Sequence, residues 1–289
     1  MAYKGHRINP NRFEKSQIKI ICLVLPLVIF MALPIIFIIN HAFKPMQELF
    51  AFPPTFFVRN PTMDNFTSLV KASRTAGIPM SRYVFNSLII TVLTIFLSLL
   101  FTTCAAFSLS KIKYRAKYLL MDINQIAIMF VGTAVLIPRY LVISFGGMID
   151  TYLAHILPLV AMPVALFLVK QFVDQVPDSL MEAAYIDGAT DLQVYLKIII
   201  PMIKPAIATA AIMVFQQVWT NMETSNYFVN DDSMKTLTFY MNTLANANNT
   251  VAGQGMAAAA ALIMFIPNLV LFILLQNNVM NTMATSGIK

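Results

Sequence analysis

The sequence predicts an all-α integral membrane protein with six transmembrane helices and one long polar loop between the fourth and fifth helices. The 289 residues are 58% apolar and only 11% charged, with a mean hydropathy of +0.71. This composition lies outside the range of ordinary soluble domains. Apolar segments near 20 residues also recur along the chain, and helices of that length cross a hydrocarbon core of about 30 Å.

The predicted spans share this length and a low content of charge. In chain order they cover roughly residues 18–40, 83–110, 119–143, 152–172, 205–221 and 257–277. The first contains the run IICLVLPLVIFMALPIIFII, residues 20–39, which carries no charge, and it is expected to stay as a membrane anchor. A cleaved signal peptide is the alternative, but its apolar region is usually about 7–15 residues and is followed by a small-x-small cleavage site.

The later spans carry irregular features. Asp122 and Arg139 lie near the ends of the third span, and Pro158 and Pro163 lie in the fourth. Proline kinks are tolerated in a membrane where neighbouring helices or cavities satisfy the freed backbone groups. We therefore expect kinks in the fourth span, and the charges make the third the weaker of the predicted spans.

The distribution of basic residues predicts the orientation. With the amino terminus in the cytoplasm, six spans return the carboxyl terminus there and leave 13 Lys and Arg residues inside and seven outside. The compact loop KIKYRAK, residues 111–117, contributes most to this asymmetry. The net charge of +7 is thus a topology signal rather than a sign of nucleic-acid binding. The long outer connection, residues 41–82, is predicted to be extended, with a short helix after Asp64.

The polar loop, residues 174–204, must lie outside the hydrocarbon. It holds seven charged residues. At about 3 kcal/mol each at the bilayer centre, they oppose insertion by on the order of 20 kcal/mol. The predicted topology places this loop in the cytoplasm. The chain then reads as a basic segment, residues 1–17, followed by one membrane domain, residues 18–289.

Capping signals predict two short helices in this loop. Ser179 with Glu182, after Pro177, fits a capping box, and Thr190 with Gln193 fits a second. Gly188 stands between them, where a helix end commonly needs a left-handed residue.

The second helix is expected to be interrupted by Pro201, and the first helix, near residues 180–187, to expose an apolar surface. That surface comprises Leu180, Met181, Ala183, Ala184, Tyr185 and Ile186. A short helix that cannot bury such a surface needs a partner. The alternative is a loop lying at the headgroup interface, with Glu182 as no more than a cap.

The pattern EAAxxDGA, followed after about a dozen residues by proline, resembles the cytoplasmic EAA loop of permease subunits of bacterial ABC importers, particularly the maltose-type carbohydrate group. Its residues here are Glu182, Ala183, Ala184, Asp187, Gly188, Ala189 and Pro201. The stretches FNSLIIT, LIPRYLVI, DTYLAHILP, IPNLVLFILLQ and SGIK resemble other parts of the family. The resemblance covers the chain from about Ile18 onward.

The resemblance implies an inner-membrane permease that is not itself an enzyme. It implies a second permease subunit, two ATPase subunits that bind ATP and Mg, and an extracytoplasmic binding protein that delivers a sugar, expected to be an oligosaccharide. In the family the EAA helices lie in a cleft of the ATPase, where the glutamate, Glu182 here, meets a basic residue. ATP binding would then drive alternating access through helices at residues 180–187 and 192–200.

Polar residues in two spans are candidates for a sugar pathway, since sugars need hydrogen bonds and aromatic faces. They are Asn124, Gln125, Gln216, Gln217, Trp219, Asn221 and Glu223. The alternative is that they form interhelical hydrogen bonds with the partner subunit, usually worth about 1 kcal/mol or less. Thr220 after Trp219 departs from the Trp-Asn pair that is commoner in the family.

Other chemistries find little support. No GxxxxGK[ST] loop is present, so ATP hydrolysis is expected in separate subunits. His6, His41 and His155 lie in unrelated settings, Cys22 and Cys104 lie in apolar runs, and no metal site is predicted. A permease for a polyamine or an anion stays open, with Arg139 the only candidate to face an anion. A stand-alone secondary transporter would show inverted repeats, which we do not find.

Overall fold

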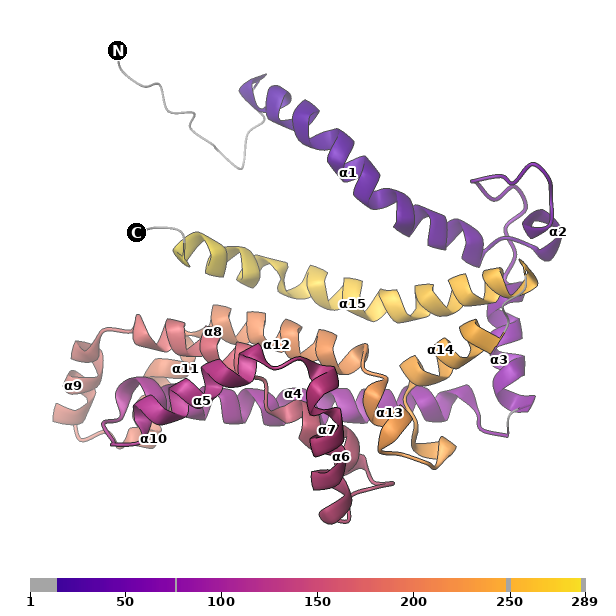
Figure 1. The fold of residues 1–289 in the computed structure, drawn as a ribbon. Coiled ribbons are helices and arrows are strands. Elements are labelled where there is room, and N and C mark those ends of the chain that lie inside the picture. The colour runs from indigo at the N-terminus through magenta and orange to yellow at the C-terminus, as the bar shows by residue number, and fades with distance from the viewer. Residues whose placement is uncertain (1–14, 76, 248–250, 287–289) are drawn as a thin grey trace. The chain divides into compact units, whose positions relative to one another are not determined.

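The computed structural model describes residues 15–75, 77–247 and 251–286, which form helices and turns without a strand (Figure 1). They divide into two compact units. The first comprises the chain up to residue 69 together with residues 245–262, and the second comprises residues 70–244 and 263–289. Helices α3 (Asp64–Thr75), α14 (Leu237–Ala247) and α15 (Val251–Ser286) contribute to both units.

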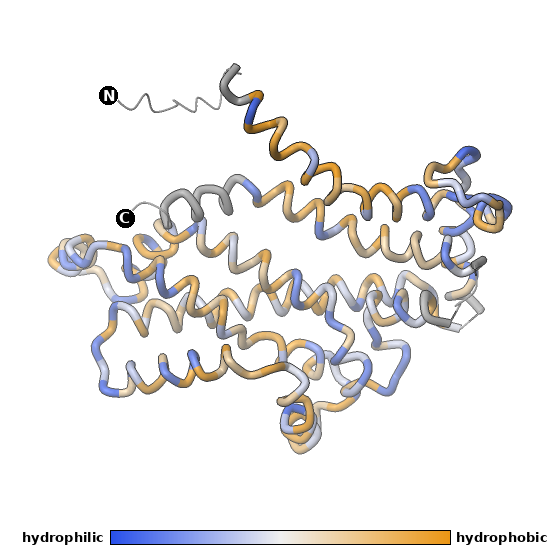
Figure 2. The backbone as a smooth tube through the Cα atoms, turned by 45° about the horizontal axis from the view of Figure 1, so that its top comes forward, coloured by the Kyte–Doolittle hydropathy of each residue, from blue (hydrophilic) through white to orange (hydrophobic). Residues whose placement is uncertain are grey.

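The first unit contains α1 (Lys15–Ala42) and α2 (Met46–Leu49), and α1 is apolar over most of its length (Figure 2). Side-chain amides hold the connection after α1. Asn65 Nδ2 donates to the carbonyls of Ala42 and Lys44, each at 2.9 Å. A Cβ added to Gly255 of α15 would lie 2.6 Å from Asn65 Oδ1, so glycine permits this close approach. The helix predicted after Asp64 begins at that residue.

The second unit is built around α4 (Met80–Lys111), which packs against α7 (Tyr152–Val160), α8 (Pro163–Asp174) and α12 (Lys204–Trp219). One apolar core joins α4, α8 and α12 near the Lys111 end and includes Phe107, Val169 and Ile203. A second joins α4, α7 and α12 along the helix and includes Ile90, Leu159 and Val214. The long predicted second span is thus the helix around which this unit is assembled.

Helix α4 is amphipathic, but its polar face is buried and its apolar face is exposed, which is the reverse of a helix in a water-soluble protein. Its buried side chains are largely small and polar, whereas many of its apolar side chains are exposed. The buried set is Asn86, Ser87, Thr91, Thr94, Ser98, Thr102 and Thr103, and the exposed set is Phe85, Leu88, Val92, Leu93, Phe96, Leu100 and Phe101. Small residues let membrane helices approach closely, and lipid rather than water solvates the apolar face. This arrangement confirms the predicted membrane protein.

The third predicted span is broken into two helical parts. Helix α5 (Lys117–Met129) ends at Phe130, which takes extended backbone like the next residue, Val131. A 3-10 turn, η1 (Gly132–Val135), then leads into α6 (Leu136–Phe145). The two parts meet at 110°. A β-branched valine followed by glycine is a weak helix sequence, which makes this the place where a bend costs least.

The fourth predicted span is also bent, and another bend lies directly before the fifth. Helices α7 and α8 meet at 46°, and the break falls at residues 161–162 with Pro163 opening α8. Pro158 remains inside α7. The region of the fifth span bends by 80° between residues 191–202 and 204–227.

Among the described residues, three helical stretches are long and apolar enough to cross a membrane: Ile18–Ala42, Met80–Lys111 and Gly253–Gln276. The total reaches six if each bent pair is one span. The connection after α12 contains α13 (Glu223–Tyr227), the 3-10 turn η3 (Asp232–Met234) and α14. Helix α15 also begins earlier than the predicted residue 257.

Candidate functional site

The first helix of the polar loop, α9 (Asp178–Ile186), begins without a side-chain cap. Pro177 takes extended backbone before it, so Ser179 lies inside the first turn, and the predicted capping box of Ser179 and Glu182 is wrong. Pro177 fixes its own φ, and the helix starts two residues earlier than the sequence signal suggests. Glu182 therefore does not cap this helix. It is exposed and makes no side-chain hydrogen bond or ion pair within the described chain.

The link between the two short helices is confirmed. Gly188 has φ +81°. Its N–H donates to the Tyr185 carbonyl at 3.0 Å, and the Ala189 N–H donates to the Ala184 carbonyl at 2.9 Å. These two bonds form a Schellman motif, which satisfies the last carbonyls of α9.

The predicted second capping box is also confirmed. The Gln193 N–H donates to Thr190 Oγ1 at 3.4 Å, and the Thr190 N–H donates to Gln193 Oε1 at 2.9 Å. Helix α10 (Asp191–Val194) therefore starts where the sequence places it. It continues into a π-helical turn, η2 (Tyr195–Ile199), and then α11 (Ile200–Met202).

Pro201 does not interrupt this helical segment, contrary to the prediction. In η2 the Ile200 N–H donates to the Tyr195 carbonyl five residues earlier. Proline has no N–H, and its ring crowds the preceding turn of an α-helix. A wider π turn directly before Pro201 accommodates both defects. The bend into α12 instead falls at Ile203, directly before the start of that helix.

The EAA residues form an exposed surface with a hollow beside it. Glu182, Ala183 and Asp187 are exposed, whereas Ala184 and Ala189 are half-buried. The hollow has a volume of about 500 Å³ and is lined by Ala184, Asp187, Gly188, Ala189, Gln193, Val194, Lys197 and Ile198. Met181, predicted to be exposed, is 7% exposed and packs in the apolar core, so that prediction is wrong. The surface offered to a partner is narrower than the sequence suggests.

The same segment is firmly attached to α4. The Lys111 ammonium donates to the Val176 carbonyl and to Asp178 Oδ1, both at 2.6 Å. Its hydrogen bond and charge hold the pKa of the Asp178 carboxyl below its ordinary value. Tyr195 Oη lies 2.7 Å from Thr103 Oγ1. The Lys111 end of α4 therefore lies beside the polar loop, on the same side as the KIKYRAK loop.

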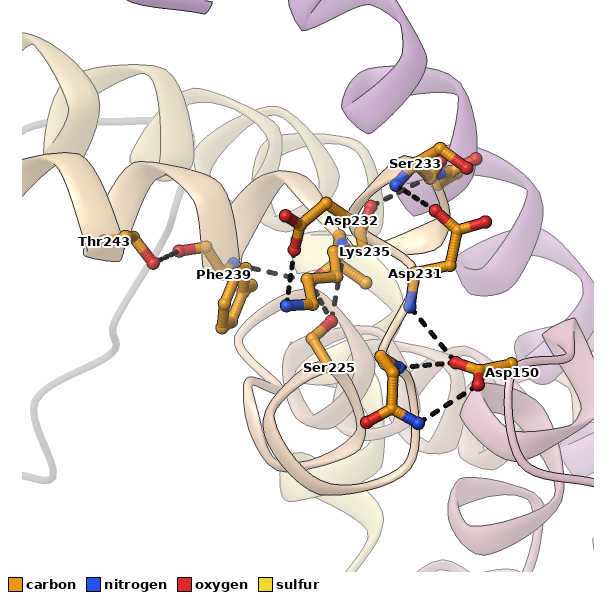
Figure 3. A network of polar contacts seen from close by, with 11 residues as sticks. Asp150, Ser225, Asp231, Asp232, Ser233, Lys235, Phe239 and Thr243 are labelled. Atoms are coloured by element: carbon orange, nitrogen blue, oxygen red, sulfur yellow. Dashed lines mark hydrogen bonds and ion pairs between the residues drawn. The ribbon is translucent and has the colours of Figure 1, made fainter. Parts of the chain in front are cut away.

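Other polar connections gather at the Met80 end of α4. Asp150, between α6 and α7, accepts from the Asn230 N–H at 2.5 Å and from the Asp231 N–H at 3.2 Å (Figure 3). Arg82 Nε donates to the Ser233 carbonyl at 3.2 Å. A helix of 32 residues is about 48 Å long at 1.5 Å per residue. The two polar ends of the second unit are thus separated by more than a bilayer core.

The candidate pathway residues separate into two groups. Gln125, Gln216 and Gln217 are exposed, so their amides are available to a solute or a second chain. Asn124 is buried and its Nδ2 donates to the Pro163 carbonyl at 3.2 Å. It lines a hollow of about 180 Å³ at the break between α7 and α8.

The other candidates are engaged within the fold. Trp219 is 5% exposed, its ring stacks on Phe215 with centroids 5.6 Å apart, and its Nε1 donates to the Met264 carbonyl at 3.1 Å. Asn221 Oδ1 accepts from the Thr224 N–H at 3.1 Å, and Glu223 is paired with Arg139. All of these interactions lie within one chain. The alternative that these side chains form interhelical hydrogen bonds therefore requires no partner subunit at these positions.

Sequence reasoning missed several residues that organise the unit. His155 is fully buried with Nδ1 2.8 Å from Thr224 Oγ1. Asn86 and Tyr152 are bonded to each other at 2.8 Å, and neither was selected as a site residue. A signal was present, because a large polar side chain in an uncharged apolar helix is costly unless it is paired.

Comparison with known proteins gives consistent results. The family described as binding-protein-dependent transport system inner membrane component matches residues 104–279. Protein LplC of Bacillus subtilis is 29% identical over 89% of each chain. The melibiose/raffinose/stachyose import permease protein MelC of the same organism is 30% identical and covers 71% of this chain and 74% of its own.

Among solved structures, a bacterial ABC transporter involved in the import of the acidic polysaccharide alginate aligns with a TM-score of 0.79. It is 20% identical and covers 92% of this chain and 98% of the other. At that identity the likeness concerns the fold.

Proposed function

The chain belongs to the family of binding-protein-dependent transport system inner membrane components, and on that premise we propose that it translocates a sugar, most simply an oligosaccharide, by ATP-driven alternating access. It is a membrane-embedded ABC permease subunit. The proposal adds the solute, the docking surface and the orientation. In it, residues 1–17 form a basic cytoplasmic segment, residues 18–289 the transmembrane domain, and residues 174–204 the coupling loop.

The observation that carries the proposal is the construction of the coupling loop. Glu182 is exposed and unpaired, Gly188 turns the chain tightly, and a hollow lies beside them. The loop is at the same time joined to α4 through Lys111 and Tyr195. A surface that is open to a partner and fixed to a spanning helix can convey a partner's displacement to that helix.

The partners follow from this surface. Two ATPase subunits would bind ATP and Mg and receive the EAA surface, with Glu182 facing a basic residue. A second permease subunit, expected to form a heterodimer with this chain, would complete the pathway, and a binding protein would deliver the solute on the opposite side. This requires the polar loop and both termini to lie in the cytoplasm of a bacterium, as the basic residues predict.

The sugar is supported by the relatives and by the exposed amides. MelC is named for the import of melibiose, raffinose and stachyose, and Gln125, Gln216 and Gln217 can hydrogen-bond hydroxyl groups. The alternative of an anion permease loses its candidate cation, since Arg139 is paired with Glu223. A polyamine would require exposed carboxylates along the same helices.

The test is assembly with candidate ATPase subunits. Glu182→Lys should weaken co-purification of the ATPase at least about tenfold, because a pair with a basic residue becomes a repulsion, which costs several kcal/mol at an interface. Asn226→Lys also introduces a lysine, at an exposed position on α13 at the Met80 end, and should leave assembly unchanged. Equal assembly of both variants would contradict the docking surface. Thermal stabilisation of the cognate binding protein by a panel of sugars would identify the solute, and stabilisation by polyamines alone would refute the sugar.

A further inference from the structure

Asn86 is a fully buried amide on the second turn of α4 whose hydrogen bonds all reach other elements. Its Nδ2 donates to the carbonyls of Ser233 at 2.8 Å and Lys235 at 3.0 Å. Its Oδ1 accepts from the Tyr152 hydroxyl at 2.8 Å. Both amide hydrogens and the amide oxygen are therefore used, and they connect α4 to the start of α7 and to the connection after α13.

That connection, residues 228–237, is here called the strap. It lies along the first two turns of α4 through further contacts. The Leu237 N–H donates to Ser87 Oγ at 2.8 Å, and directly beyond the strap Tyr240 stacks on Tyr83 with ring centroids 4.4 Å apart. The carbonyls of Ser233 and Lys235 belong to irregular backbone, so a side chain has to satisfy them where water does not.

The far edge of the strap is fixed to the connection between α6 and α7. Asp150 accepts three hydrogen bonds, from the Asn230 N–H and Nδ2 and from the Asp231 N–H (Figure 3). The Asp150 N–H donates in return to the Phe228 carbonyl at 3.1 Å. The Phe228 side chain is fully buried among Ile143 and Ala154. The strap is thus tied to α4 along one side and to α7 along the other.

We propose that Asn86 is a positioning residue that makes the Met80 end of α4, the start of α7 and the strap move as one body during transport. The inference rests on the proposed function for its role, since this end faces the binding protein in that topology. The exposed tip of the strap, Asn230 to Asp232, would then be presented in one fixed arrangement. Helix breaks elsewhere in the unit permit movement. The junction of α4, α7 and the strap is instead held by three hydrogen bonds of the Asn86 amide.

The test compares Asn86→Asp with Thr94→Val in the full chain assembled with its partners. Aspartate keeps the oxygen that accepts from the Tyr152 hydroxyl. Its second oxygen replaces Nδ2 and faces the carbonyls of Ser233 and Lys235 without a proton to donate. Thr94 lies on the same buried face of α4 and its hydroxyl has no partner, so the isosteric valine removes no bond. Backbone hydrogen exchange in residues 233–240 should rise about tenfold or more in Asn86→Asp, and should stay unchanged in Thr94→Val. Unchanged exchange in Asn86→Asp, or an equal rise in Thr94→Val, would overturn the inference.

Two further measurements separate a positioning role from general damage. Tyr152→Phe removes one hydrogen bond without a change of shape and should give a smaller rise in backbone hydrogen exchange in the same peptides. This variant replaces Asn86→Asp in the test if Asn86→Asp fails to assemble. In uptake assays Asn86→Asp should raise the KM for the loaded binding protein several-fold, with turnover at saturation within about twofold. A fall in turnover with unchanged KM would refute the positioning role. Exchange needs no solute, so failure of the unsubstituted chain to import sugars would refute the proposed function and leave the exchange result standing.

Discussion

The two ends of α4 are joined to their surroundings by different means. At the Lys111 end, an apolar core with Val169, Ile199 and Ile203 is supplemented by polar contacts of Lys111, with the Val176 carbonyl and Asp178, and of Thr103, with Tyr195. At the Met80 end, side-chain amides, hydroxyls and a carboxylate hold irregular backbone through many hydrogen bonds. Apolar packing is non-directional, whereas hydrogen bonds fix both distance and angle.

This difference suggests that the two ends of α4 have different roles in the proposed transport cycle. An apolar core transmits a push and tolerates small sliding of its side chains, which suits a segment that receives the movement of an ATPase. A hydrogen-bonded junction either keeps its geometry or breaks, which suits a surface that must be presented in one form. Three experiments test this difference between the two ends of α4.

Ile199→Ala should have the largest effect, because Ile199 is fully buried in the core at the Lys111 end. Truncation there should cost roughly 2–5 kcal/mol, through lost burial and a residual cavity. Leu196→Ala removes a side chain of the same composition that is 53% exposed on the same segment and should cost far less. Thermal unfolding of the purified chain in nanodiscs would measure both. Similar losses in the two variants would show that the coupling segment is not held by this core.

Much of this end could be predicted because its signals are local. The left-handed Gly188 and the box of Thr190 with Gln193 depend on residues within one turn, and both are confirmed. The inverse amphipathicity of α4 likewise follows from its composition. The apolar length of the predicted spans and the permease family are also readable from the sequence, and the comparisons bear out the family.

Two contacts that sequence reasoning did not anticipate join elements distant in sequence. Met181 looks like part of an exposed stripe, but it packs in the core formed with α4 and α8. The Trp219 Nε1 donates to the Met264 carbonyl, 45 residues further along the chain. Neither contact can be derived from spacing along the chain, because each joins elements whose approach is fixed by the whole bundle. The capping box of Ser179 with Glu182 failed for a local reason instead, since Pro177 takes extended backbone and α9 begins directly after it.

Gly188→Ala should have an intermediate effect that isolates backbone strain. A Cβ at Gly188 would meet no atom within 4 Å, so the only penalty is its φ of +81°, about 1 kcal/mol for an L residue in the left-handed region. Gly132→Ala also meets no atom within 4 Å and has no positive φ. Solute-stimulated ATP hydrolysis by the assembled importer should fall for Gly188→Ala and not for Gly132→Ala. If both variants match the unsubstituted protein, the tight turn is not needed for coupling.

The smallest effect concerns two carboxyl groups whose pKa values are lowered for different reasons. At Asp178 the main cause is the hydrogen bond and charge of the Lys111 ammonium, whereas at Asp150 it is hydrogen bonds from Asn230 and the Asp231 N–H. Each folded pKa lies below the unfolded value, so each group stabilises the fold above its unfolded pKa, about 3.9, and this contribution is lost as the pH falls through the lowered folded pKa.

Salt distinguishes the two carboxyl groups, because it screens charges and leaves hydrogen bonds from neutral amides in place. The Debye length falls from about 30 Å at 0.01 M to about 3 Å at 1 M, and the Asp178 side chain is 75% exposed. Carboxyl ¹³C titrations, assigned with Asp178→Asn and Asp150→Asn, should show the pKa of Asp178 moving back toward its ordinary value in 1 M salt while that of Asp150 stays low. Equal movement of both pKa values would mean that charge, rather than amide hydrogen bonding, holds the strap to α7.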